Sequence, residues 1–188
     1  MNRLTIKSNF TIKKVNNLDE LKHAFNTGFI PLFDECFAVA PYFLKYPDEE
    51  LWRIYSDHFK SGFVIFAYDE TNNLVGFAGS RELAKDEYVD EDVKSNFPDI
   101  ENYWYHSDLG VANSARGQGL AQLLIQETIH LTPKGKKILM RTKDDNLSSI
   151  KLHKKMGFVD TGISQKGNSN GVENDNRIYL VYNKAGDE

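Results

Sequence analysis

The amino-acid sequence predicts a mixed α/β layer in which helices pack on one sheet. Segments with strand-like alternation and segments with helical spacing follow one another along the 188 residues, without an internal repeat or a low-complexity linker. Hydrophobic residues make up 40% of the chain, which is enough for one core. We therefore expect residues 1–188 to form a single domain.

The first half of the chain predicts a strand, then helices, then a hairpin. Asn17 is a plausible helix N-cap, and Glu20 follows it at the spacing of a capping box. Phenylalanines recur every four residues from Phe25 to Phe37, although Pro31 should break or restart a helix there. The expected elements are a strand at 10–15, a helix at 18–25, a helix at 47–59 and a hairpin at 63–82.

The second half alternates strands and helices after a long acidic connection at 83–102. This connection is longer than most loops in compact domains, and it could attract a cationic amine or close as a lid. Its plainest interpretation is a solvated surface loop. The elements expected after it are strands at 103–111, 137–142, 158–163 and 177–182 and helices at 116–131 and 147–156.

Composition narrows the possible classes of protein. No apolar run is long enough to cross a membrane, and Met1 to Lys7 lacks the apolar stretch of a signal peptide, so we expect a cytoplasmic protein. A net charge of -4 argues against nucleic acid as a partner and is compatible with a cationic amine. The single cysteine, Cys36, excludes an internal disulfide and is best interpreted as a small buried hydrophobe. The five histidines show no metal-ligand spacing, so no metal is expected.

A glycine-rich turn opens the helix expected at 116–131. A helix start leaves backbone N–H groups unpaired and carries the positive end of the helix dipole. Gly117 and Gly119 let an anion approach those groups, and Arg116 adds a charge that pairs with phosphate. A diphosphate is therefore the natural ligand, and an ordinary strand–turn–helix is the alternative.

Other phosphate-binding turns fit this segment less well. A dinucleotide-binding turn has G-x-G-x-x-G directly after a strand, but Gln122 occupies the third glycine position and several residues separate Val111 from Gly117. An oxidoreductase of that kind would use Asp144 as a candidate ribose ligand. No G-x-x-x-x-G-K-[ST] occurs, which excludes a P-loop.

Two linked motifs resemble one known family. The segment Arg116 to Ala121 resembles the R/Q-x-x-G-x-G/A signature of the GNAT family of N-acetyltransferases. Asn146 to Phe158 resembles the second signature of that family, which is an Asn, a helix and then Gly-Phe. The two motifs stand in the right order with one strand between them. The resemblance is specific over 103–158 and looser over 62–82 and 158–182.

The resemblance implies a mostly antiparallel central sheet with splayed strands, flanked by helices, and acetyl-CoA as the cosubstrate. The pantetheine arm would lie between the strands at 103–111 and 137–142, and the helix after Asn146 would line its other side. Strand backbone groups would bind the pantetheine and the glycine-rich turn would bind the diphosphate. The coenzyme A-binding residues expected in this way are Leu109, Gly110, Val111, Arg116, Gly117, Gln118, Gly119, Leu120, Ala121, Asn146, Ser149 and His153.

Acetyl transfer from a thioester to an amine needs a base, an oxyanion donor and a proton for the departing thiolate. The resemblance assigns the oxyanion to the backbone N–H of Val111, freed where the strand bulges. The family commonly places a tyrosine four residues before Gly157, and this chain has His153 there. An imidazole can still donate a proton or hydrogen bond near neutral pH, or it can pack beside the coenzyme without a chemical role.

The base is not obvious from the sequence. Where many relatives carry Glu or His, this chain has Tyr105 and Ser107, which lose protons only far above neutral pH. His106 and Asp108 are better bases, but strand alternation places them on the opposite, solvent-facing side unless a bulge reverses it. Glu82 on the neighbouring strand is a further option. We expect a water relay with Tyr105 and Ser107 as hydrogen-bond partners.

The resemblance implies an N-acetyltransferase that acts on a primary amine of a small molecule or peptide, as a monomer or homodimer. The acceptor site would lie between the N-terminal helices and the hairpin, although aromatic residues at helical spacing are mostly core. A non-catalytic coenzyme A thioester-binding module is the alternative. The aromatic residues that could line the acceptor site are Phe29, Phe33, Phe37, Trp52 and Tyr55.

Overall fold

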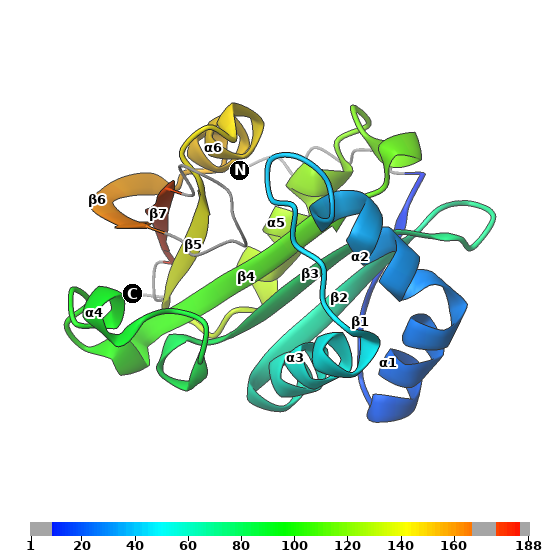
Figure 1. The fold of residues 1–188 in the computed structure, drawn as a ribbon, viewed down its shortest axis with the longest axis horizontal. Coiled ribbons are helices and arrows are strands. Elements are labelled where there is room, and N and C mark those ends of the chain that lie inside the picture. Colours follow the sequence, from blue (N-terminus) through cyan, green and yellow to red (C-terminus); the bar gives the residue numbers. More distant parts are fainter. Residues whose placement is uncertain (1–8, 167–175, 185–188) are drawn as a thin grey trace.

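A computed structural model describes residues 9–166 and 176–184, and it has a seven-stranded sheet with helices on both faces (Figure 1). The segment Met1 to Lys7 lies outside the described residues. The strand order is β1-β2-β3-β4-β5-β7-β6. The strands are β1 (Thr11–Lys14), β2 (Gly62–Tyr68), β3 (Leu74–Glu82), β4 (Tyr103–Val111), β5 (Lys137–Lys143), β6 (Val159–Lys166) and β7 (Asn176–Asn183).

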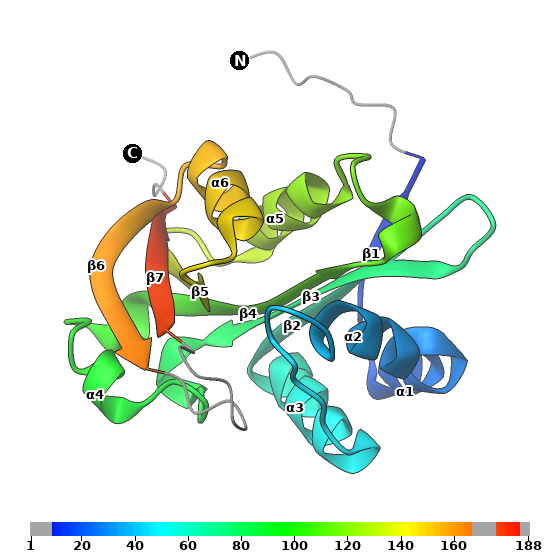
Figure 2. The ribbon, with the colours of Figure 1, turned by 45° about the horizontal axis from the view of Figure 1, so that its top comes forward.

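The helices form two layers (Figure 2). The N-terminal helices α1 to α3 cover one face of the sheet, and α5 and α6 cover the other. The helices are α1 (Leu18–Ala24), a π-helix (Phe25–Phe29), α2 (Ile30–Phe37), α3 (Asp48–Ser61), α4 (Glu91–Lys94), α5 (Leu120–Leu131) and α6 (Leu147–Lys155). Short 3-10 turns occur at Leu83–Lys85, Ile100–Asn102 and Asn113–Ala115.

Local sequence signals explain the N-terminal layer. The side chain of Asn17 accepts a hydrogen bond from the backbone N–H of Glu20 at 2.9 Å, which confirms the expected cap of α1. The helix restarts as α2 at Ile30, with Pro31 in its first turn. Backbone N–H groups in the first turn have no intrahelical acceptor, so proline loses no hydrogen bond there. Phe29 and Tyr55 from these helices are fully buried against the sheet.

Strand β4 pairs in parallel with β5 over a short stretch and then leaves it. The register runs from Tyr103 opposite Lys137 to His106 opposite Met140, and no pairing follows. On its other edge β4 stays paired with β3, but Gly79 lies opposite Asp108 and Ser80 lies opposite His106. Ser107 is therefore the extra residue of a β-bulge. The sheet is mostly antiparallel with a splayed parallel pair, as the family resemblance implies.

The acidic connection at 83–102 is not a solvated surface loop, contrary to the expectation. It carries α4 and two 3-10 turns, and Leu83, Val89, Val93 and Phe97 are buried in a second hydrophobic cluster. Apolar residues spaced between the acidic ones make this burial possible, since the acids can face outward while the apolar side chains pack.

A buried ion pair joins this connection to the sheet. Arg81 and Asp86 are 2% and 1% exposed, and the Arg81 guanidinium lies 2.7 Å from the carboxylate. The second carboxylate oxygen accepts hydrogen bonds from the backbone N–H groups of Tyr88 and Val89. Asp86 therefore holds the start of the connection in place and compensates the positive charge of Arg81.

Among the described helices, none is both long and apolar enough to cross a membrane.

Replacing Asp86 by Ala should lower the free energy of unfolding by about 3–5 kcal/mol, because it leaves Arg81 buried without a countercharge. Urea unfolding measures this loss. Glu87→Ala is the control, since the Glu87 side chain is 72% exposed and its ion pair with Arg53 contributes at most about 1 kcal/mol. Equal losses for the two variants would contradict the structural role of the buried pair.

Candidate active site

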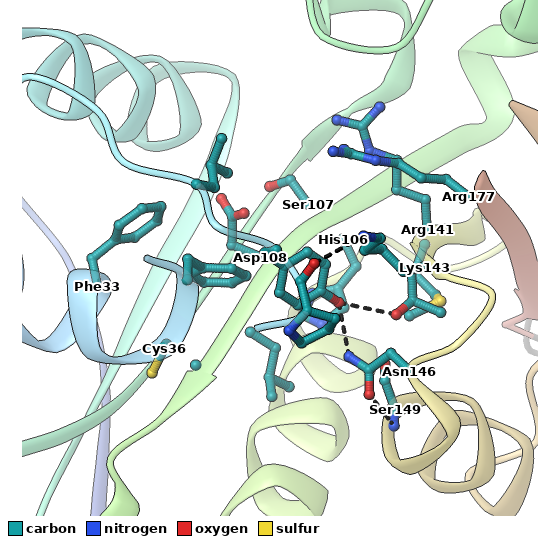
Figure 3. Close-up of a pocket in the computed structure, with 18 of the residues that line it drawn as sticks. Phe33, Cys36, His106, Ser107, Asp108, Arg141, Lys143, Asn146, Ser149 and Arg177 are labelled. Atoms are coloured by element: carbon teal, nitrogen blue, oxygen red, sulfur yellow. Dashed lines mark hydrogen bonds between the residues drawn. The ribbon is translucent and has the colours of Figure 1, made fainter. Parts of the chain in front are cut away.

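A cleft of about 510 Å³ lies where β4 and β5 separate (Figure 3). Its walls come from β4, β5, the start of α6 and the segment that follows α2. Splayed strands leave a gap that neither strand can fill, so the cleft follows directly from the end of pairing at His106. The cleft reaches Arg116 and Ala121 at the start of α5 on one side and Tyr46 and Tyr88 on the other.

His58 of α3 reaches the bulge from the N-terminal layer. Its Nδ1 lies 2.6 Å from the carbonyl oxygen of Ile54 and must donate to it, since a carbonyl can only accept. Its Nε2 forms a short hydrogen bond with the hydroxyl of Ser107. The His58 ring is 1% exposed, and burial lowers its pKa while Asp108 opposes that shift. His58 is therefore a neutral imidazole with an available lone pair at Ser107.

The bulge places Asp108 on the same side of the sheet as Ser107. Asp108 Oδ2 lies 3.9 Å from His58 Nε2 and accepts a hydrogen bond from the Tyr55 hydroxyl at 3.4 Å. The expectation that strand alternation puts Asp108 on the opposite face is wrong, because the extra residue resets the alternation. The Asp108 side chain is 21% exposed, so it does not lie on an open solvent-facing surface, and this burial raises the pKa of its carboxyl.

His106 lies on the opposite face, as alternation predicts, but it is buried rather than solvent-facing. Its ring is 3% exposed, its Nδ1 lies 3.3 Å from the Ser80 hydroxyl, and its ring centroid is 6.0 Å from that of His153. Burial lowers the pKa of His106 to about 3, with the nearby His153 as the next cause. The two rings form a neutral pair between β4 and α6.

His153 of α6 lines the cleft with its Nε2 facing no polar partner among the described residues. Its Nδ1 lies 2.9 Å from the carbonyl oxygen of Ser149 and must donate to it. Burial lowers its pKa, so Nε2 carries a lone pair and acts as a hydrogen-bond acceptor. Of the two roles that the sequence leaves open for His153, proton donation through Nε2 does not fit this tautomer.

A hydrogen bond between Asn146 and Tyr42 joins the start of α6 to the segment after α2 beside the cleft. Asn146 Oδ1 accepts from the backbone N–H of Ser149 and so caps α6, while its Nδ2 donates to the Tyr42 hydroxyl at 2.9 Å. The same hydroxyl lies 3.0 Å from Thr142 Oγ1. Tyr42 follows α2 in sequence, and no motif singled it out. The cleft therefore has a fixed tyrosine hydroxyl next to the expected coenzyme A-binding Asn146.

The start of α5 forms an open cradle. Gly117 and Gly119 have φ values of 74° and 83°, a region that favours glycine, and an added Cβ would meet nothing within 4 Å at either position. No side chain caps the helix at this end. Gln118 donates its side-chain amide to Ser114, and Leu120 is buried beneath the turn. The cradle fits a diphosphate, because its backbone is accessible and lies at the positive end of a 12-residue helix.

Strand geometry decides which β4 groups face the gap. The N–H of Ala112 donates to the Val75 carbonyl of β3 at 2.9 Å, so alternation directs the backbone groups of Gly110 to β3 and those of Leu109 and Val111 to the open edge. Gly110 has no side chain because the Phe77 ring packs against its Cα: a Cβ there would lie 2.3 Å from that ring. The bulge lies at Ser107, four residues before Val111, so the expectation of a bulge at Val111 is wrong.

The remaining expected site residues lie on the rim of the cleft or in the core. Arg116 Nε donates to the Val111 carbonyl at 3.2 Å, which holds the arginine beside the cradle. Tyr105 is 1% exposed, and burial raises the pKa of its hydroxyl, which excludes it as a base. Burial also raises the pKa of the Cys36 thiol to about 11, so this half-buried residue is no thiolate. Of the aromatic residues expected at the acceptor site, Phe33 and Phe37 line the cleft.

The model of the acetyltransferase (GNAT) family matches residues 26–158, which is more than half of the chain. The chain belongs to the GNAT acetyltransferase family. No curated protein sequence matches it significantly.

Several solved GNAT-like structures share the fold. The putative acetyltransferase yncA from Salmonella typhimurium, solved with its cofactor acetyl-CoA, has a TM-score of 0.67 and 17% identity over 96% of this chain and 97% of its own. A phosphinothricin acetyltransferase from Sinorhizobium meliloti, in complex with acetyl-CoA, has a TM-score of 0.68 and 16% identity over 94% and 89%. Naa50 from Arabidopsis thaliana, with a bisubstrate analogue, has a TM-score of 0.64 and 20% identity over 93% and 98%.

Membership of the GNAT family agrees with the cleft and the cradle, both of which lie where the two sequence motifs meet. In the described part of the chain, no group of three or more His, Cys, Asp or Glu residues could hold a metal ion. The residues that the family signatures did not indicate are His58, Tyr42 and Arg141, which come from α3, the segment after α2 and β5. No local pattern marks them, because folding alone brings them to the cleft.

The buried His106 makes the stability of the fold depend on pH. Its pKa of about 3 lies below the ordinary value of 6.5, so between these pH values the unfolded chain binds a proton that the folded chain does not. The free energy of unfolding should therefore fall as the pH falls, by about 2 kcal/mol from pH 7 to pH 5 for His106 alone. Urea unfolding at a series of pH values tests this, with His106→Gln as the comparison. Identical pH slopes for the parent and the variant would contradict a neutral, buried His106.

Proposed function

We propose that this protein is an N-acetyltransferase that moves the acetyl group of acetyl-CoA to a primary amine by direct attack. One observation supports this most strongly: an open strand edge runs from the Ser107 bulge to the uncapped start of α5, with a neutral imidazole at the bulge. The edge suits an extended amide-containing arm, the helix start suits a diphosphate, and the imidazole suits an amine that must lose a proton.

Acetyl-CoA supplies an activated acyl group as a thioester, and the chain provides the binding groups. The backbone N–H groups of Leu109 and Val111 bind the pantetheine as an added strand would. Those from Gly117 to Ala121, with Arg116, hold the diphosphate. Leu109 lies closest to the bulge on the open edge, so its N–H is the better placed donor for the carbonyl oxygen, where negative charge develops. This assigns to Leu109 the role that the family resemblance gives to Val111.

His58 is the base in this proposal, and Ser107 passes the proton to it. In the neutral state the Ser107 hydroxyl donates to His58 Nε2. When His58 gains a proton, Nε2 becomes a donor to Ser107 Oγ, and the Ser107 hydroxyl can turn to the Gly79 carbonyl oxygen at 3.1 Å. Asp108 then lies 3.9 Å from a positive ring, which stabilises it. Every donor in the protonated state therefore has an acceptor in place.

Tyr42 and His153 flank the position of the departing sulfur. The Tyr42 hydroxyl is held by Asn146 and Thr142 and can donate to a thiolate, whereas neutral His153 accepts through Nε2. We assign the proton-donor role to Tyr42, because the tautomer of His153 leaves it no proton to give on that side. His153 then fixes the coenzyme arm by accepting a hydrogen bond.

Incubation of the protein with acetyl-CoA and a library of primary amines tests the proposed activity. Release of free thiol together with an acetylated product, identified by mass spectrometry, is the expected result. Tight binding of acetyl-CoA without turnover of any amine would favour the non-catalytic binding module instead.

Gly119→Glu should abolish coenzyme A binding, because its carboxylate opposes the phosphates and its side chain blocks the backbone at φ 83°. Calorimetric titration with coenzyme A measures the loss. Gly135→Glu is the matched control, since Gly135 also has a positive φ of 75° and open space around it but lies in the turn after α5. Wild-type affinity in Gly119→Glu would show that the cradle is not the diphosphate site.

His58→Gln should lower kcat by about 10²–10⁴-fold while leaving the dissociation constant for coenzyme A unchanged, because the amide can hydrogen-bond Ser107 but cannot take a proton. Steady-state kinetics across pH should also show that the acid limb of the kcat/KM profile, set by a group with a pKa below that of a free imidazole, disappears. His23→Gln on the exposed side of α1 serves as the control. An unchanged kcat in His58→Gln would assign the proton transfer to another group.

A further inference from the structure

The acidic connection at 83–102 contributes an aromatic wall to the cleft, and the proposed mechanism gives this wall no role. Tyr88 belongs to the connection and lines the cleft on the side away from the start of α5. The sequence left open whether the connection could close as a lid. The contacts of Tyr88 show instead that it is a fixed wall.

The backbone of Tyr88 is held on both sides. Its N–H donates to Asp86 Oδ1 at 2.8 Å, and its carbonyl oxygen accepts from Arg141 Nη1 at 3.0 Å. Asp86 is buried in its ion pair with Arg81, and the next residue, Val89, is buried in the second hydrophobic cluster. A lid movement at Tyr88 would break these hydrogen bonds and expose buried groups, which is costly.

The ring of Tyr88 is held by two arginines. Arg53 Nη2 donates to the Tyr88 hydroxyl at 2.6 Å. The guanidinium carbons of Arg53 and Arg81 lie 5.8 Å and 5.7 Å from the ring centroid, which is within the range of cation–π contacts. Arg53 belongs to α3, the helix that carries His58. One helix therefore positions both the proposed base and the ring of Tyr88.

This wall lies close to the place where the amine must react. Burial is the main cause that lowers the pKa of His58, but the charges of Arg81 and Asp86 also act on it, in opposite directions. The ion pair that anchors Tyr88 is therefore near the proposed base. Ile54, whose carbonyl oxygen accepts from His58, lines the cleft as well.

The space for an acceptor is small and largely aromatic. Phe33 and Tyr46 line the cleft with their ring centroids 6.0 Å apart. Burial raises the pKa of the Tyr46 hydroxyl to about 12, with Asp108 as the next cause, so Tyr46 is neutral and near the bulge. The cleft has about 510 Å³ for the coenzyme arm and the acceptor together, which is in the lower half of the range for small-molecule sites.

We propose that Tyr88 is a specificity-determining residue that limits the length of the acceptor, so that the protein acetylates short primary amines rather than long-chain amines or polypeptide N-termini. The inference rests on the proposed N-acetyltransferase function and narrows its substrate class. An amine at Ser107 and His58 directs its substituent along the aromatic walls toward Tyr88. A longer substituent meets the ring, which cannot turn aside without losing its contacts with Arg53 and Arg81.

Bisubstrate conjugates test the proposal without turnover. Each conjugate carries –CH₂–CO–NH–R on the sulfur of coenzyme A, where R is an unbranched alkyl chain from methyl to octyl. The affinity, measured by calorimetric titration, should rise about fourfold for each methylene that is buried. It should then fall about tenfold or more at the first chain that meets Tyr88. Affinity that never falls up to octyl, or conjugates that all bind more weakly than coenzyme A, would overturn the proposal.

Two substitutions of Tyr88 assign the limit to its ring. Tyr88→Ala should raise the affinity for the first chain that the parent rejects by about tenfold or more, and it should bind coenzyme A itself as tightly as the parent. Tyr88→Phe is the matched control, since it keeps the ring and should keep the limit. If Tyr88→Ala does not fold, Tyr88→Leu shortens the side chain while keeping more of its packing. An unchanged limit in the folded variant would overturn the assignment.

This test and the test of the proposed activity can fail separately. A length limit that is lost in Tyr88→Ala would support the wall even if no amine is acetylated. Acetylation of octylamine or of a peptide N-terminus with the same kcat/KM as a short amine would overturn the proposal, although it would confirm N-acetyltransferase activity.

Discussion

The function of this fold depends on the point where β4 stops pairing with β5. Pairing ends at His106, and Ser107 bulges immediately afterwards. A strand edge without a neighbour must find hydrogen-bond partners, because unpaired backbone groups in a protein interior are costly. The open edge of β4 is therefore an interruption of the sheet and, in the proposed function, the surface that binds an extended ligand. The cradle at the start of α5 lies at the far end of the same edge, so one irregularity would set the path of the whole coenzyme in this proposal.

The bulge also sets the chemistry on the opposite side of the sheet. It brings Ser107 and Asp108 to the same face, where α3 presents His58. A regular strand would have directed Asp108 to the other layer, beside His106, and left the imidazole of His58 without its carboxylate. The two faces consequently differ in the proposed mechanism: the neutral His106 and His153 lie on the face assigned to the coenzyme, whereas His58 and Asp108 lie on the face assigned to the acceptor. Burial acts on both faces, since it lowers the pKa of His106 to about 3 on one and lowers the pKa of His58 on the other.

The sequence predicted the parts of this arrangement that rest on local signals. The glycine-rich turn, the helix after Asn146 and the order of strands and helices follow from backbone requirements that a few neighbouring residues express. Positions that depend on tertiary contacts were not predictable. The bulge at Ser107 has no signature of its own, so the face of Asp108 and the position of the bulge were misassigned. In the sequence, His58 is one of several polar residues in an amphipathic helix, and nothing distinguishes it from them. The buried apolar residues of the acidic connection are interspersed with charged ones, so their burial was not predicted.

Calorimetric titration of the protein with acetyl-CoA tests the central claim, that the open edge of β4 and the start of α5 together form a coenzyme A site. NAD serves as the control ligand, since it has a diphosphate but no pantetheine arm to pair with a strand. We predict binding of acetyl-CoA with a dissociation constant in the micromolar range or tighter, about −8 kcal/mol or better, and no comparable binding of NAD. Absence of acetyl-CoA binding would contradict it, and the turn at Gly117 and Gly119 would then be an ordinary helix start.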